Sequence, residues 1–234
     1  MACRLVRVRY LRLTSYFLLL TSKIPIRQLT RATLLEGTWA LAARDPILAG
    51  VVRRHGPPPL WGRRPGFSTL VRIILDQQVS LAAARTMFLR LEKAAGAVTH
   101  DAIAEFGIER LRKLGFTRQK SAYVHQLALE LTSGSLDLGA ISRGEDEAGR
   151  ARLMQLHGFG PWSVDIYYLM ALRRPDVWPH GDLALADAIH RLGYTRSRAD
   201  YDRIRRLAER WAPWRAVAAR ILWHHYLESR RKDR

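Results

Sequence analysis

The stretch that decides the fold is Leu156-His157-Gly158-Phe159-Gly160-Pro161-Trp162-Ser163, which lies between two segments of helical periodicity. Two glycines that flank one apolar residue favour a tight hairpin, because glycine adopts positive φ without steric cost. Pro161 suits the first turn of the next helix, where a backbone N–H has no intrahelical partner. The exposed amides, with the positive end of the helix dipole behind them, form an anion site that needs no charged side chain. We expect Leu156 and Phe159 to anchor this hairpin in the core.

The rest of the chain also reads as helices. Apolar residues recur at three- and four-residue spacing, and no alternating run of β-branched residues indicates a strand. The sequence therefore predicts an all-α fold. Its helices are expected at about residues 31–43, 45–54, 68–76, 80–95, 108–114, 118–133, 145–156, 161–172, 183–192, 199–211 and 214–229.

Small residues mark the ends of several of these helices. Glycine in a left-handed conformation commonly ends a helix, and a serine side chain commonly caps its first turn. We expect helices to end at Gly96, Gly115, Gly134 and Gly193, and to begin at Ser68, Ser80 and Ser197.

The charge of the chain indicates a polyanionic partner. The 39 Lys and Arg residues outnumber the 21 Asp and Glu residues, which gives a formal net charge of +18. Such a field attracts nucleic acid, although a merely soluble basic protein or a membrane-surface binder would also carry it. Cys3 is the single cysteine, which excludes intrachain disulfides, thiolate zinc sites and four-cysteine iron–sulfur clusters. The apolar run at residues 16–20 is too short to span a bilayer.

Charge and proline content also suggest how the chain is organised. The first acidic residue is Glu36, so the start of the chain reads as a basic leader, an organelle-type presequence or the product of a start placed too far upstream. We expect residues 1–28 to lie outside the fold and residues 29–234 to form one helical unit. The stiff segment from Pro57 to Gly66 is the best boundary. The hairpin lobe is expected at roughly 72–175, and a second lobe at roughly 29–71 and 176–234.

The hairpin segment resembles the helix-hairpin-helix motif of the DNA glycosylase superfamily. A Gly-x-Gly between helices is otherwise ordinary turn chemistry, so the surrounding sequence decides. The resemblance extends over roughly residues 67–227. This part of the sequence is similar to the DNA-3-methyladenine glycosylase II branch of the superfamily. It implies a two-lobed helical fold. It also implies an enzyme of base-excision repair that flips damaged, alkylated bases out of duplex DNA and hydrolyses their N-glycosidic bonds. The further matching blocks are residues 74–80, 111–116, 176–182, 206–215 and 221–223.

Asp182 is the candidate catalytic residue. Breaking an N-glycosidic bond develops positive charge on the sugar, which a fixed carboxylate stabilises. The resemblance places Asp182 at the catalytic aspartate of the family. It also stands directly before an apolar helix, where propensity alone favours a capping role over a catalytic one, and both roles can coexist. We expect the nearby Asp165, Asp176 and Asp187 to be solvated or to cap helices.

The resemblance also assigns the base pocket. Family members that cut the DNA backbone carry a lysine two residues after the second hairpin glycine, and Trp162 occupies that position here. Simple hydrolysis is therefore predicted, because no Schiff base can form. Trp162 and Trp223 are expected to hold the flipped base, although core packing is the ordinary role of a tryptophan. Ile166 stands where some relatives place a tyrosine, which predicts a more apolar pocket. Trp178 and Trp214 are the second-choice candidates for the pocket.

The remaining candidates contact DNA. In the family, a residue at the position of Gln78 fills the gap left by the flipped base, and Gln77 lies beside it; an exposed turn capped by Ser80 explains these residues equally well. Arg118 and Lys120 are expected either to contact phosphates or to be ordinary surface charges. The hairpin residues expected to bind DNA are Gly158, Phe159, Gly160 and Ser163.

No cofactor or metal is predicted to be required, and the resemblance implies only a monovalent cation at the hairpin near Gly158 and Gly160. The expected partner is double-stranded DNA with damaged bases, bound by a monomer without a membrane. The expected location is the bacterial cytoplasm and nucleoid, or an organelle or the nucleus in a eukaryote. Two alternatives stay open: a glycosylase for another lesion, and a non-catalytic helix-hairpin-helix module that only binds DNA.

Overall fold

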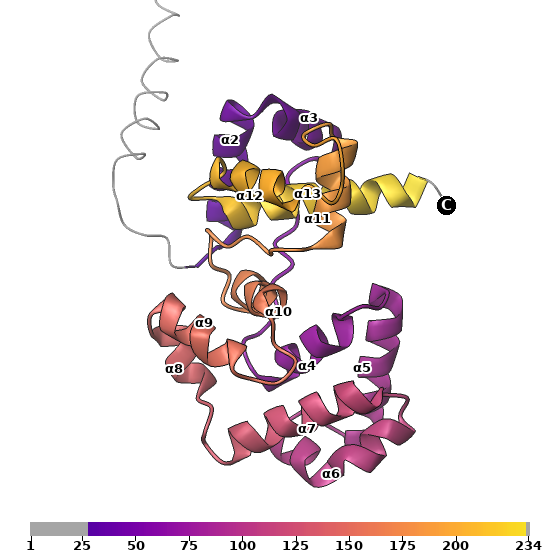
Figure 1. Ribbon diagram of the computed structural model, residues 1–234. Coiled ribbons are helices and arrows are strands. Elements are labelled where there is room, and N and C mark those ends of the chain that lie inside the picture. The colour runs from indigo at the N-terminus through magenta and orange to yellow at the C-terminus, as the bar shows by residue number, and fades with distance from the viewer. Residues whose placement is uncertain (1–27, 233–234) are drawn as a thin grey trace, which may run out of the picture.

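The computed structural model describes residues 28–232, which form two groups of helices, one above the other in Figure 1. All regular structure in this range is helical, which confirms the predicted all-α fold. The predicted basic extension, residues 1–28, falls almost wholly outside the described residues. None of the helices in residues 28–232 is long and apolar enough to cross a membrane.

The upper group, here called the terminal lobe, is built from both ends of the described chain. The long helix α13 packs against α2, α3 and α11, while α12 packs on α11 and α13. The bounds of these helices are α2 (Arg31–Arg44), α3 (Pro46–His55), α11 (Leu183–Arg191), α12 (Tyr201–Glu209) and α13 (Arg215–Lys232).

The lower group, here called the hairpin lobe, contains the central part of the chain. Helix α4 packs against α5, α7 and α10, and α6 packs along α7. The elements are α4 (Phe67–Asp76), α5 (Leu81–Ala95), α6 (His100–Lys113), α7 (Arg118–Thr132), α8 (Leu138–Arg143), α9 (Asp146–Met154), α10 (Pro161–Ile166) and the π-helix η2 (Tyr167–Ala171).

Most predicted helix ends are confirmed. Gly96, Gly115, Gly134 and Gly193 all have φ between 73° and 97°, as left-handed helix ends require. The Ser80 side chain caps α5 by accepting from the backbone N–H of Ala83 at 3.2 Å.

The predicted caps at Ser68 and Ser197 are wrong. Helix α4 begins after Gly66 and has no side-chain cap, whereas α12 is capped by Asp200. The predicted helix at 108–114 corresponds to the second part of α6. Gly107, with φ 76°, interrupts α6, and the first part, from His100, was not predicted. Helix α8 was not predicted, since its six residues are too few to show a period.

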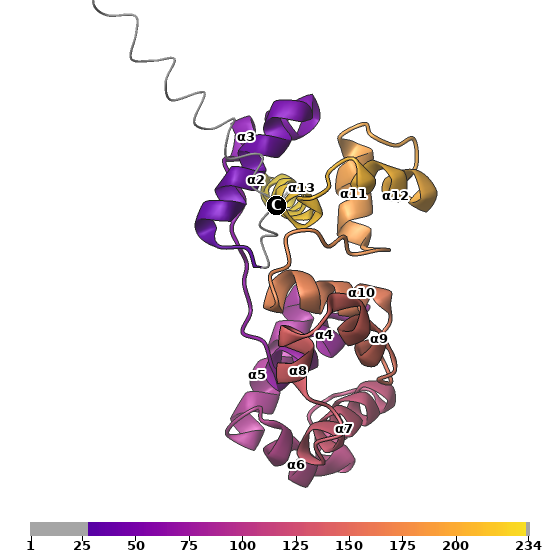
Figure 2. The same cartoon turned by 90° about the vertical axis from the view of Figure 1, so that its left-hand side faces the viewer.

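Two extended segments cross between the lobes in Figure 2, one after α3 and one after η2. Arg220 on α13 holds the first of these segments and the π-helix η2, which precedes the second. Its buried guanidinium donates to the carbonyls of Leu60 in the first segment and Leu169 in η2, each at 2.8 Å, and to Ala216 at 2.9 Å. Burial, together with the positive charge of Arg173, lowers the pKa of Arg220 to about 9. The side chain therefore fixes α13 against the hairpin lobe one turn before Trp223.

Asp45 holds the terminal lobe together. Its buried carboxylate caps α3 through the N–H groups of Ile47 and Leu48 and accepts from Tyr194 Oη at 2.6 Å and Trp211 Nε1 at 2.9 Å. Burial alone would raise the pKa of Asp45, but these hydrogen bonds lower it below its ordinary value of 3.8. One side chain thus joins α3 to the segments on both sides of α12.

We predict that Asp45→Ala lowers the free energy of unfolding by about 3 kcal/mol, because it removes a cap and leaves two buried donors without an acceptor. A lowered carboxyl pKa stabilises the fold above the unfolded value and ceases to do so as pH falls through the folded value. The variant should therefore also lose part of the acid sensitivity of stability below about pH 4. Urea unfolding at pH 7 and pH 3 measures both effects. Asp137→Ala, which removes an exposed cap of α8, is the control and should cost less; an equal cost would contradict this role for Asp45.

Candidate active site

The predicted hairpin is present between α9 and α10. Leu156 and Phe159 are buried, which confirms their predicted role as anchors, and the N–H of Phe159 donates to the carbonyl of Leu156 at 3.1 Å. Pro161 is the first residue of α10. The hairpin is therefore fixed from inside, and its outer backbone faces away from the core.

The two hairpin glycines are needed for different reasons. Gly158 has φ 86°, and a Cβ atom there would overlap the ring of Tyr123. Gly160 has φ −88°, a value that any residue adopts, and a Cβ atom there would meet nothing within 4 Å. Neither strain nor internal packing explains glycine at 160. A missing side chain at this exposed position leaves room for a ligand to approach the backbone closely.

Gln77 joins the hairpin to the end of α4. Its side-chain amide donates to the carbonyl of Gly158 at 2.7 Å and to Ser163 Oγ at 2.9 Å. Ser163 is buried, so its hydroxyl faces this amide rather than the surface. The side chains of Gln77 and Ser163 therefore support the hairpin from behind.

Gln78 is exposed in this turn, as is Val79 after it. Its φ is 55°, and left-handed conformations of residues other than glycine are costly and concentrate at functional sites. Lys120 holds the turn, because its ammonium group donates to the carbonyls of Leu75 at 2.8 Å and Gln77 at 2.9 Å. Lys120 thus caps the end of α4 and is not an ordinary surface charge; its contact with phosphate stays a prediction. Burial lowers the pKa of Lys120, and the negative charge of Asp76 partly opposes this shift.

Asp182 lies at the start of α11, and its half-buried carboxylate accepts three hydrogen bonds. Oδ1 accepts from the N–H of Leu185 at 2.9 Å, which is the predicted helix cap, and from Trp223 Nε1 at 3.1 Å. Oδ2 accepts from Trp162 Nε1 at 2.9 Å. Trp162 comes from α10 in the hairpin lobe and Trp223 from α13 in the terminal lobe. Both indoles therefore turn their N–H edges to one carboxylate between the lobes.

The other pocket candidates lie deeper. Trp162 is half-buried, whereas Trp223 is 9% exposed and Ile166 is 5% exposed. The second-choice candidate Trp178 is buried against Trp211, with ring centroids 5.4 Å apart, and Trp214 is buried beside Gly37. Trp162 is therefore the tryptophan beside Asp182 with the most accessible surface.

Asp182 differs from the other acids around it. It forms no ion pair with any residue in the described range 28–232. The expectation that its neighbours are solvated or cap helices is wrong for the buried Asp165 and Asp187. Asp176 accepts from the backbone N–H of Arg215, the first residue of α13, at 3.3 Å and also pairs with its guanidinium. Asp165 pairs with Arg150 and His180, Asp176 with Arg215, and Asp187 with Arg191 and Arg198.

The pair between Asp165 and His180 was not predicted from the sequence. The Asp165 carboxylate is 1% exposed, and its Oδ2 accepts from the backbone N–H of His180 at 3.2 Å and from His180 Nδ1 at 3.1 Å. An acid between Val164 and Ile166 in an apolar helix was the available signal, since a buried carboxylate requires partners. His180 is two residues before Asp182, so this bond anchors the loop that carries the candidate catalytic residue.

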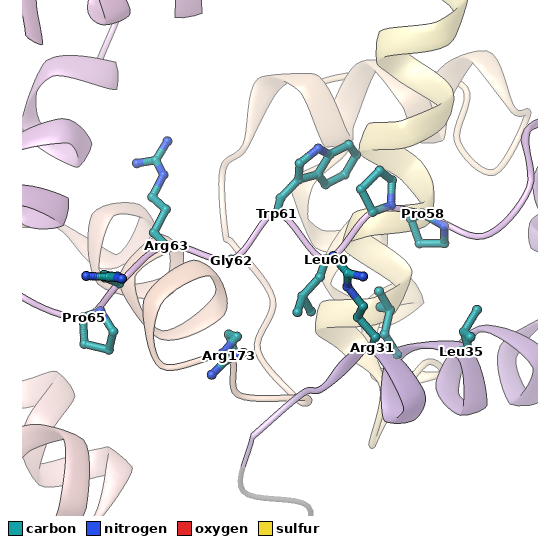
Figure 3. Close-up of a pocket in the computed structure, with 12 residues that line it drawn as sticks. Arg31, Leu35, Pro58, Leu60, Trp61, Gly62, Arg63, Pro65 and Arg173 are labelled. Atoms are coloured by element: carbon teal, nitrogen blue, oxygen red, sulfur yellow. The ribbon is translucent and has the colours of Figure 1, made fainter. Parts of the chain in front are cut away.

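A cavity of about 730 Å³ lies elsewhere, between α2 and the segment that leads to α4 (Figure 3). Neither Asp182 nor any of its hydrogen-bond partners Trp162, Leu185 and Trp223 is among the residues that line it. In Figure 3 the side chain of Arg63 extends from this segment away from Arg173, which belongs to the chain after η2, and Arg63 pairs with Asp76 at 3.0 Å. This cavity is distinct from the site around Asp182.

Known proteins resemble this chain in sequence. DNA-3-methyladenine glycosylase 2 of Escherichia coli is 27% identical over 199 residues, which cover 79% of this chain and 67% of the relative. A Bacillus subtilis protein described as a DNA-3-methyladenine glycosylase is 26% identical over 184 residues, 75% of this chain and 64% of its own length. A Mycobacterium tuberculosis protein described as a bifunctional transcriptional activator/DNA repair enzyme is 33% identical over 164 residues. The matched part is 65% of this chain but 32% of that relative, so this chain spans only part of some curated relatives.

The fold has solved counterparts as well. The 3-methyladenine DNA glycosylase Mag1 of Schizosaccharomyces pombe, solved in complex with abasic DNA, superimposes with a TM-score of 0.68 at 26% identity, covering 80% of this chain and 95% of that one. Residues 71–213 match the family described as HhH-GPD superfamily base excision DNA repair protein. This match covers more than half of the 234 residues and includes the hairpin, Gln78 and Asp182. The chain therefore belongs to the HhH-GPD superfamily of base excision DNA repair proteins.

Proposed function

We propose that this protein is a monofunctional DNA glycosylase that hydrolyses the N-glycosidic bond of alkylated bases in duplex DNA. The observation that carries the proposal is that the Asp182 carboxylate is held by hydrogen bonds and forms no ion pair within residues 28–232. In a chain of net charge +18, its neighbouring acids are paired with basic residues, whereas Asp182 is held by three neutral donors. Neutral donors orient a carboxylate and leave its charge uncompensated, so it can stabilise a cation that forms beside it.

The hydrogen bonds also indicate which oxygen reacts. A carboxylate offers about four lone-pair sites, roughly two on each oxygen. Oδ1 accepts two donors, from Leu185 and Trp223, and Oδ2 accepts one, from Trp162. We therefore assign to Oδ2 the contact with the sugar or with the attacking water. Positive charge develops on the sugar as its bond to the base breaks, and a carboxylate placed beside it stabilises that charge.

The aromatic surroundings favour a positively charged base. An indole face attracts a cation by roughly 0.5–2 kcal/mol beyond stacking. Trp162 and Trp223 are fixed by their bonds to Asp182, so a flipped base beside them would stack against the indoles with its sugar close to the carboxylate. Ile166 adds an apolar surface to the pocket. An alkylated purine carries the required charge and is already a good leaving group, which one carboxylate suffices to assist.

The exposed turn and the hairpin supply the contacts to DNA. We assign to Gln78 the insertion into the gap left by the flipped nucleotide, because its exposed side chain sits on a turn fixed by Lys120. The backbone of Gly158, Phe159 and Gly160 would bind a phosphate without reading sequence. Trp162 stands in place of a nucleophilic lysine, so water is the expected nucleophile.

A cation and an assembly state also belong to this proposal. The Gly158 carbonyl already accepts from Gln77, and its second lone pair leaves room for a monovalent cation beside the phosphate. No step of the reaction depends on this ion. We propose that the protein acts as a monomer on DNA inside the cell.

We predict that Asp182→Asn lowers base release from methylated duplex DNA about 100-fold or more, since the amide keeps the helix cap but removes the charge. Mass spectrometry of the freed bases measures the rate, and duplex binding should stay within about threefold. Asp176→Asn is the matched control, because it removes a paired carboxylate from the same loop. Full base release by the Asp182→Asn variant would contradict the role of the charge. Binding without any release by the unmutated protein would favour a DNA-binding module, and release of other lesions would favour a different specificity.

We predict that Gln78→Gly raises the free energy of unfolding by up to about 1 kcal/mol, because glycine tolerates the positive φ at this position. The same change should lower base release, since nothing then fills the stack. Fluorescence of 2-aminopurine placed in the duplex reports flipping directly. Arg173→Gly is the control. It relieves the same kind of backbone strain, at φ 53°, away from the site and should leave flipping unchanged. If Gln78→Gly flips bases as the parent does, the insertion role is wrong.

A further inference from the structure

The loop that carries Asp182 is attached to α10 at two points. Trp162, near the start of α10, donates to Asp182 itself. Asp165, one turn later, accepts both the backbone N–H and the Nδ1 of His180. Its other oxygen accepts from Arg150 of α9. One buried carboxylate therefore joins α9, α10 and this loop.

Gly181 makes the second attachment necessary. It separates His180 from Asp182 and has φ 74°, so this part of the loop has the freedom of a glycine in a left-handed conformation. The chain after Asp182 is fixed by α11. The chain before it is held by the bonds of His180 to Asp165 and by a longer bond, 3.4 Å, from the N–H of Asp182 to the carbonyl of Pro179. The bonds to Asp165 thus help to set the direction from which the backbone enters Asp182.

The geometry also selects the tautomer of His180. An ionised carboxylate accepts hydrogen bonds only, so Nδ1 must carry the proton that points to Asp165. The side chain of His180 is 53% exposed although Nδ1 contacts a carboxylate that is 1% exposed. The edge that bears Nε2 is therefore the open edge, and the edge that bears Nδ1 performs the anchoring.

We infer that His180 is a positioning residue for Asp182, acting through the bond from Nδ1 to the buried, Arg150-paired Asp165. The inference rests on the proposed function, in which Asp182 is the reacting carboxylate. Loss of the imidazole bond leaves the backbone N–H of His180 as the single link to Asp165. A carboxylate that is less well aligned slows the chemical step, whereas DNA binding through the hairpin and Gln78 does not depend on it.

Three substitutions at His180 separate this role from its alternatives. The amide nitrogen of asparagine overlies Nδ1 of histidine, and the amide nitrogen of glutamine overlies Nε2. In single-turnover base release, we expect His180→Ala and His180→Gln to be about 10-fold slower than the parent and His180→Asn to lie within about threefold of it. Duplex affinity and thermal stability should stay unchanged, because the side chain is half-exposed.

Two other patterns would overturn the inference. Recovery by glutamine but not asparagine would mean that His180 acts through Nε2 on its exposed edge. A parental rate in His180→Ala would mean that the bond to Asp165 has no effect on the reaction. Asp146→Asn, which removes the ion pair of α9 with Arg174 but no bond of Asp165 or His180, is the control and should keep the parental rate.

A second readout does not require activity. The indole N–H signals of Trp162 and Trp223 in a ¹H–¹⁵N spectrum report their bonds to Asp182. They should shift in His180→Ala and stay in place in His180→Asn, and unchanged signals in both would overturn the positioning role. If the unmutated protein releases no base, the proposed function fails, while these spectra still decide whether His180 positions Asp182.

Discussion

Asp182 joins the two lobes through the hydrogen bonds of one carboxylate. Trp162 reaches it from the hairpin lobe and Trp223 from the terminal lobe, while the first turn of α11 supplies the third donor. A carboxylate removed partly from water requires such partners, since an unsatisfied charge is costly to bury. The same three bonds therefore stabilise the meeting of the lobes and aim the charge.

Several interactions farther from Asp182 also fix the positions of the site residues. Arg220 fixes α13 against the hairpin lobe, which sets the position of Trp223. Gln77 ties the end of α4 to the hairpin, and Lys120 fixes the turn that presents Gln78. The exposed turn, the hairpin and the carboxylate thus belong to one connected framework. This connection explains how a largely helical chain holds exposed loops in defined positions.

The sequence predicts correctly those features that depend on neighbouring residues, and it misses contacts between distant segments. The hairpin, the glycine helix ends and the Asp182 cap follow from residues close together in sequence, and the structure confirms them. The resemblance to a family supplied the importance of Trp162 and Trp223, but their shared bond to Asp182 joins residues 20 and 41 positions away from it. The bonds of Lys120 and the Asp165–His180 pair were missed for the same reason. Periodicity and propensity describe single segments, and they carry no information about which segments meet.

The most direct test of the account compares two abasic duplexes that differ in one charge. One carries a pyrrolidine nucleotide, whose ring nitrogen is cationic at the position of the anomeric carbon, and the other carries neutral tetrahydrofuran. An enzyme complementary to a cationic transition state binds its charged mimic more tightly. The account predicts about 100-fold tighter binding of the pyrrolidine duplex, although the protein as a whole carries a net charge of +18. Equal affinity for the two duplexes would contradict the claim that an uncompensated carboxylate faces the sugar.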